Sequence, residues 1–149
     1  MGFRVPWAAL ARLGQAHWFF GNLYEAAVDV PRLLADAGPD RAAGLLAPGS
    51  PLRYYAPAAP VTLTATAVAL LRSDGDRRAA ATSAASTLVA AALTGYLVKT
   101  VNLRLLGGEP LGDDDRRRLL ATWHRGNLLR LVALAVAAAT LRRATGPAR

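Results

Sequence analysis

Cysteine is absent from this sequence, and lysine occurs once, as Lys99. The chain therefore has no disulfide framework and no thiolate to serve as a nucleophile or a metal ligand. Charge is also scarce, because charged residues make up 19% of the 149 positions while hydrophobic residues make up 53%. That balance is more apolar than in an average soluble domain. The length is sufficient for one domain, and we treat residues 1–149 as a single unit.

The positive charge comes almost entirely from arginine, which occurs 17 times and gives a net charge of +8. A nucleic-acid binder usually gathers such charge on one face, with aromatic residues between. Here the arginines lie at the ends of apolar segments, as is typical of charges that flank membrane spans. We therefore expect no nucleic-acid partner.

Four apolar stretches dominate the chain. The second contains 18 residues without a charge (Tyr54–Leu71) and the third 20 (Ala79–Val98), lengths that suffice for crossing a bilayer. Alternation with period two is absent, and alanine and leucine predominate, so all four are predicted to be helices. The predicted fold is an all-α, four-helix transmembrane bundle with up-down-up-down topology. Its spans are expected at about 6–30, 54–71, 79–101 and 119–141.

The predicted connections follow from turn-forming residues. Gly38–Pro51 is expected to be a loop, Ser73–Asp76 a tight turn, and Gly107–Pro110 the end of the third stretch. Asp113, Asp114 and Asp115 suit the first turn of a helix, where acidic groups complement the helix dipole. We expect a short helical extension there, before the fourth span.

The membrane partner is predicted to be a lipid bilayer, namely the bacterial cytoplasmic membrane. Arg12, Gln15 and His17 interrupt the apolar core that a cleaved signal peptide needs, so the first segment is expected to remain as an anchor. Four spans place both termini on one side. Seven arginines belong to that side and eight to the other, so their distribution selects no orientation.

Unusual polar residues fall within these apolar stretches, where they are costly to bury and suggest function. Antiparallel threading places all of them in the half of the bundle away from the termini. Several of these residues lie three positions apart in the sequence, for example Asn22 and Glu25. Residues with this spacing share a face of a helix. We predict a pocket with Glu25, Lys99 and His124 near its mouth, and His17 and Arg130 near its floor. The full set is His17, Asn22, Glu25, Lys99, Asn102, His124, Asn127 and Arg130.

Three strings in the sequence carry a family resemblance. His17–Glu25 (HWFFGNLYE), Lys99–Asn102 (KTVN) and Trp123–Arg130 (WHRGNLLR) resemble the anthrone oxygenase-like family of small four-helix membrane proteins. Many members of that family have no known function. The resemblance implies oxygenation of a phenolic, polyketide-like compound.

The leading functional hypothesis is a membrane-embedded oxidoreductase that acts on a small hydrophobic substrate. His124 or His17 would serve as general base, with Glu25 as a further catalytic group. Asn22, Lys99, Asn102, Asn127 and Arg130 would bind the substrate and hold its enolate oxygen. Dioxygen would accept the electrons without a bound cofactor.

Three alternatives stay open at this point. His17, His124 and Glu25 have the composition of a two-histidine, one-carboxylate iron site, although their depths differ by more than one helical turn. The protein could also be a non-enzymatic membrane binding or helper protein. It could instead be a cofactor-free isomerase or cyclase.

Overall fold

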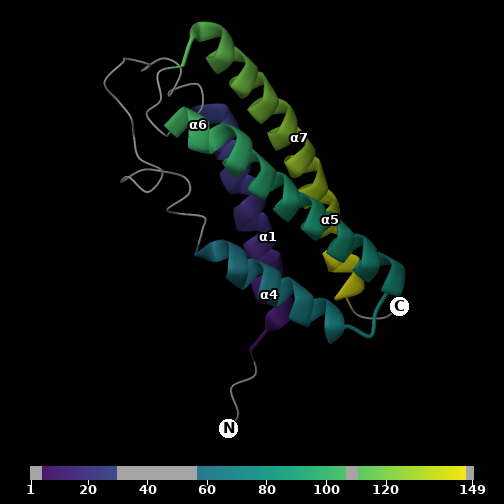
Figure 1. Ribbon diagram of the computed structural model, residues 1–149. Helices are drawn as coiled ribbons and strands as arrows, with labels where there is room; N and C mark the ends of the chain where they lie inside the picture. Colours follow the sequence, from purple (N-terminus) through teal and green to yellow (C-terminus); the bar gives the residue numbers. More distant parts are fainter. Residues whose placement is uncertain (1–4, 30–56, 107–110, 147–149) are drawn as a thin grey trace.

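The computed structural model describes residues 5–29, 57–106 and 111–146 (Figure 1). Every regular element within these ranges is helical, which confirms the all-α class. The elements form four helical runs. They are α1 (Trp7–Tyr24) with η1 (Glu25–Asp29); α4 (Ala58–Leu71); α5 (Arg77–Leu97) with η2 (Val98–Asn102) and α6 (Leu103–Leu106); and α7 (Asp113–Ala144).

The four runs alternate in direction along one elongated body (Figure 1). α5 packs along α7, and α1 packs against both α4 and α7. α4 is short and covers only the part of α1 near the N-terminus. Among the described residues, α1, α5 and α7 with their extensions η1, η2 and α6 therefore form the other end of the body.

Acidic residues start the two long helices, and the sequence analysis predicted this for the second of them. The Asp76 carboxylate caps α5 by accepting hydrogen bonds from the backbone N–H groups of Arg78 and Ala79, at 2.9 and 3.1 Å. Asp113, Asp114 and Asp115 form the first turn of α7. The predicted extension before the fourth span is therefore continuous with that helix.

Several predicted boundaries differ from the structure. The first helix changes from α to π geometry at Glu25, and the third run begins at Arg77 and ends at Leu106, beyond both predicted limits. The turn at Ser73–Asp76 connects α4 and α5 as expected. Residues 30–56 and 107–110, with the predicted loop at 38–51 and the start of the second span, lie outside the described residues.

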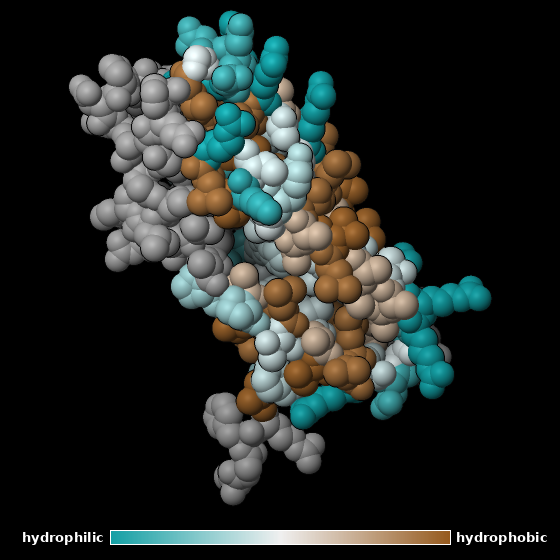
Figure 2. All heavy atoms as spheres, in the orientation of Figure 1, coloured by the Kyte–Doolittle hydropathy of each residue, from teal (hydrophilic) through white to brown (hydrophobic). Residues whose placement is uncertain are grey.

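Small and polar side chains fill much of the interior, while large apolar side chains face outward. Gln15 and Ser83 are 0% exposed, whereas Leu88 and Leu128 are 67% and 63% exposed. Figure 2 shows a broad hydrophobic surface between hydrophilic side chains at the two ends of the body. This distribution is the reverse of that in a typical soluble helical domain.

One helical run in the described part of the chain, Arg77–Leu105, is long and apolar enough to cross a membrane by length and composition. Its most apolar window is 22% buried. Ala58–Leu71 is apolar but shorter. The other two predicted spans do not meet the same criterion, since polar groups lower the hydropathy of α1 and α7.

Candidate functional site

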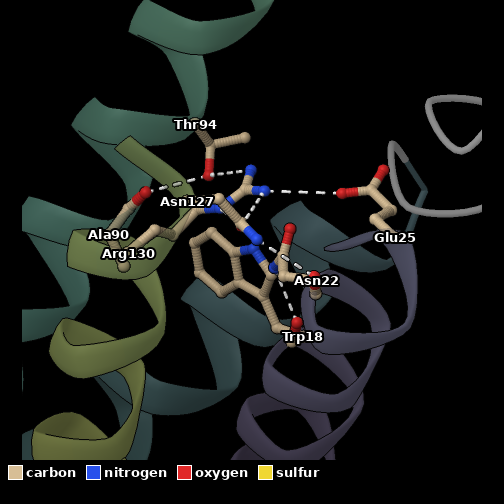
Figure 3. A network of polar contacts seen from close by, with 7 residues as sticks. All are labelled: Trp18, Asn22, Glu25, Ala90, Thr94, Asn127 and Arg130. Atoms are coloured by element: carbon tan, nitrogen blue, oxygen red, sulfur yellow. Dashed lines mark hydrogen bonds and ion pairs between the residues drawn. The ribbon is translucent and has the colours of Figure 1, made fainter. Parts of the chain in front are cut away.

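Arg130 lies at the centre of a buried group of polar side chains (Figure 3). Arg130 is 5% exposed and lies inside the bundle formed by α1, α5 and α7. Nε and Nη2 donate to Oδ1 of Asn127 at 3.1 and 2.6 Å, and Nη1 donates to Oγ1 of Thr94 at 3.4 Å. Nη2 also donates to Oε2 of Glu25 at 3.4 Å. One guanidinium thus joins three helical runs.

Asn127 links this cation to the backbone of α1. While its Oδ1 accepts from Arg130, its Nδ2 donates to the carbonyl oxygen of Asn22 at 3.2 Å. The Asn22 side chain then donates to the carbonyl of Trp18 at 2.7 Å. We refer to the five residues Asn22, Glu25, Thr94, Asn127 and Arg130 as the polar network.

Helix geometry explains why Glu25 and Arg130 meet. The sequence analysis placed Glu25 at the mouth of a pocket and Arg130 at its floor, but helical side chains lean toward the N-terminus of their own helix. In antiparallel helices these directions are opposite, so Arg130 leans toward the mouth and Glu25 toward the floor. The predicted separation in depth was therefore too large.

Two segments of π-helix adjoin the polar network. Glu25 is the first residue of η1, and η2 (Val98–Asn102) follows the part of α5 that carries Thr94. π-Segments within α-helices are frequent at functional sites, because the extra residue shifts which side chains face inward. Their occurrence in both helices that face Arg130 marks this level of the bundle as a candidate site.

The structure does not place the two histidines inside the polar network. His17 and His124 are both exposed, and the His124 ring packs edge-on against Trp123 at a centroid distance of 5.3 Å. Each residue advances the helix by about 100°, so each histidine is turned about that far from the buried tryptophan beside it. Their predicted role as general bases has no support from this placement and stays a prediction.

Lys99 and Asn102, two further predicted site residues, also lie outside the polar network. Lys99 is exposed and Asn102 is half-buried, while Val101 between them is fully buried. The inward face of η2 is thus occupied by an apolar side chain. Of the eight predicted site residues, the structure brings together Asn22, Glu25, Asn127 and Arg130.

The predicted iron ligands do not form a metal-binding group. Among the described residues, no group of three or more His, Asp or Glu side chains could hold a metal ion. His17 and His124 lie on outer helix faces, while Glu25 is buried beside Arg130. The alternative in which these three residues bind iron therefore does not fit the geometry.

A second buried polar group was not predicted from the sequence. The Gln15 amide nitrogen donates to Oγ1 of Thr66 and of Thr87, at 3.3 and 3.0 Å. Ser83 donates to the carbonyl of Ala137 at 3.0 Å, which ties α5 to α7 at the same level. These bonds connect all four helical runs below the polar network.

The spacing of small and polar residues along α5 could have identified Thr94 from the sequence. Buried residues of α5 recur every three or four positions at Ala79, Ser83, Thr87 and Ala90, and the next buried residue is Leu97. Thr94 continues that spacing, and its hydroxyl also donates to the Ala90 carbonyl at 2.9 Å. The sequence thus indicated a buried helix face that carries polar residues, but it did not show which threonine would contact Arg130.

Comparison of the chain with models of protein families, with curated proteins and with solved structures found no match.

Proposed function

We propose that the chain is an integral membrane protein that binds a small hydrophobic molecule at the polar network. The molecule would carry a weakly acidic oxygen, as phenolic and polyketide-derived compounds do. The observation that carries this proposal is the burial of Arg130 among polar partners from α1, α5 and α7. Ionisable groups inside membrane helices are costly and commonly mark ligand sites.

The distribution of side chains supports insertion into a membrane. The window of Arg77–Leu105 that could cross a bilayer is mostly unburied, unlike the core helix of a soluble protein. Large apolar residues also face outward on its neighbours, including Phe20 on α1 and Leu129 on α7, at 64% and 60% exposure. Lipid would cover these surfaces, whereas water would not be an adequate solvent for them.

The charge arrangement of the polar network suits an anionic oxygen. At 3.4 Å, the contact between Arg130 Nη2 and Glu25 Oε2 is longer than a tight charge-assisted hydrogen bond of about 2.7–2.9 Å. A phenolate or enolate oxygen would compete with this carboxylate for the guanidinium. In a dry site such a bond is stronger than in water, because the dielectric response is low.

Oxygenation is the reaction that the family resemblance implies for such a ligand. In an anthrone, the methylene group between two aromatic rings is conjugated through them with a ketone. The methylene would lose a proton to the Glu25 carboxylate, and Arg130 would hold the enolate oxygen that forms from the ketone. Dioxygen would then oxidise the carbon, so that CH2 and O2 become C=O and H2O. We assign the base to Glu25 because it is the carboxylate of the polar network, while both histidines are exposed.

Binding without turnover is the second candidate function. One observation favours it: Arg130 already has acceptors on Asn127, Thr94 and Glu25, as in a structural network. A cofactor-free isomerase or cyclase would use the same groups but would consume no oxygen.

Oxygen uptake with anthrone as the probe tests the proposal. The protein would be reconstituted in lipid nanodiscs, with empty discs to measure spontaneous oxidation. We expect one O2 consumed for each ketone formed, and loss of this activity in Arg130→Met and Glu25→Gln. Arg142→Met is the matched control, since Arg142 is exposed at the opposite end of α7.

The other outcomes of this oxygen-uptake assay distinguish between the alternative functions. Saturable binding of anthrone without oxygen uptake supports the non-enzymatic alternative and rejects the oxygenase. An isomerised or cyclised product formed without oxygen supports the third candidate. Neither binding nor conversion above the level of empty discs contradicts the proposed ligand class.

A further inference from the structure

A cleft of about 660 Å³ lies at the end of the body that carries the start of α1 and the end of α7. It is separate from the polar network, which lies at the end of α1 and near the middle of α7. Its lining comes from the first two turns of α1, the turn between α4 and α5, and the C-terminal end of α7. The cleft therefore lies where the apolar surface of the helices gives way to polar turns.

Two guanidinium groups line this cleft from different elements. Arg12 of α1 is held in place, because its Nη2 donates to the carbonyl oxygen and to Oγ1 of Thr145, at 3.2 and 2.6 Å. Arg72 follows α4 and is exposed, and its side chain forms no hydrogen bond or ion pair with the described residues. One arginine is thus prepositioned and the other is available to a ligand.

Part of the cleft lining is apolar. Trp7, Ala8 and Ala69 contribute to it, and Trp7 packs on the cluster in which α1, α4 and α7 meet. Tryptophan is enriched at the level of lipid headgroups, where one part of the ring is wet and another apolar. A cleft with cationic and apolar walls fits an amphiphile better than a free inorganic anion.

The surrounding charge favours an anionic occupant. Asp74 is the one acidic residue that lines the cleft, against Arg12 and Arg72, so the lining has a net charge of +1. Further arginines lie at the same end, where they outnumber the remaining acid, Asp76. They are Arg77, Arg78, Arg142 and Arg143. Such a cluster attracts anionic lipid headgroups.

We infer that this cleft binds the phosphate of an anionic phospholipid headgroup. Arg12 and Arg72 would donate to the phosphate oxygens, and the glycerol and upper acyl segments would lie against Trp7 and Ala69. This inference rests on the membrane insertion in the proposed function, but it does not depend on any reaction at the polar network.

Native mass spectrometry of the protein released from nanodiscs measures the retained lipid directly. In discs of mixed phosphatidylethanolamine and phosphatidylglycerol, we expect the wild-type chain to retain phosphatidylglycerol preferentially. Arg72→Gln should reduce that retention about tenfold, the equivalent of one charge-assisted hydrogen bond. Arg77→Gln is the matched control, because it removes the same charge at the same end outside the cleft.

Arg12→Gln should show a similar loss, but it also removes the bonds to Thr145. Arg72→Gln makes no such structural change and is the decisive variant. Equal retention of phosphatidylglycerol in Arg72→Gln and Arg77→Gln would overturn the inference. Displacement of the lipid by inorganic phosphate would also overturn it, since the cleft would then bind the free anion.

An alkaline carbonate wash of native membranes separates this failure from failure of membrane insertion. We expect the wild-type chain and Arg72→Gln both to stay with the membrane. Release of the wild-type chain by the wash would contradict membrane insertion, and with it both proposals. Retention of the chain with no lipid preference would contradict the headgroup site alone.

Discussion

The guanidinium of Arg130 contacts the carboxylate of Glu25 across 105 positions of sequence, with Nη2 and Oε2 separated by 3.4 Å. The two side chains are 6% and 12% exposed. This contact joins the last long helix to the end of the first, and it places opposite charges inside a bundle whose outer surface is largely apolar.

Removal of one member of the pair is expected to destabilise the protein more than removal of both. Arg130→Met and Glu25→Gln should each lower the free energy of unfolding by about 3 kcal/mol, because each removes one charge of a buried ion pair and leaves the other in place. The double variant should lose less than the sum of the two. Unfolding in mixed detergent micelles measures all three changes. Strictly additive losses would show that the two charges do not interact.

Asn127→Ala is expected to reduce stability by about 2 kcal/mol. The substitution removes the acceptor for two nitrogens of Arg130 and the donor to the Asn22 carbonyl. Asn102→Ala is the matched control, because Asn102 is half-buried and its side chain forms no hydrogen bond with the described residues. It should change stability by less than about 0.5 kcal/mol. Equal effects of the two substitutions would show that the polar network adds no stability.

Gly14→Ala is expected to separate α1 from α4. A Cβ atom at Gly14 would overlap Oγ1 of Thr62 and lie 2.8 Å from its Cγ2, and the branched threonine has little freedom to move away. Gly95→Ala is the control, since nothing lies within 4 Å of its Cβ position. That change should stabilise the helix by about 0.5–1 kcal/mol. Thermal unfolding compares the two, and a stabilising Gly14→Ala would contradict the close approach of these helices.

Chemical labelling is expected to distinguish lipid-facing from water-facing positions. The absence of native cysteine allows single cysteines to be introduced without background. Leu129→Cys and Leu88→Cys should resist an impermeant maleimide in permeabilised membranes and react after solubilisation in denaturing detergent. Arg117→Cys should react in both states, because Arg117 lies in the charged first turns of α7. Rapid labelling of Leu129→Cys in membranes would contradict a lipid-facing surface.

Local sequence signals predicted the fold class and the helical start at Asp113. Acidic residues at Asp76 and Asp113–Asp115 satisfy or complement backbone N–H groups, so their effect is visible without tertiary context. The ends of the helices were less predictable. At Glu25 and Val98 the chain changes to π geometry, which depends on packing against neighbouring helices rather than on local preference.

The candidate site was predicted in part, and the error has a geometric cause. Glu25 shares a buried helix face with Asn22, and Arg130 shares one with Asn127, as their spacing of three predicted. Spacing alone cannot tell which face of a helix is inward. His124 is also three residues from Asn127, yet the inward face passes through Trp123, so the histidine is exposed.

Binding of anthrone to the protein in lipid nanodiscs tests the central claim most directly, since it requires no assumption about turnover. Affinity should fall about tenfold in Arg130→Met, in line with loss of one charge-assisted hydrogen bond to the ligand oxygen. Arg142→Met should bind as the wild-type chain does, and circular dichroism should show that both variants keep their helices. Unchanged affinity in a folded Arg130→Met variant would contradict binding at the polar network.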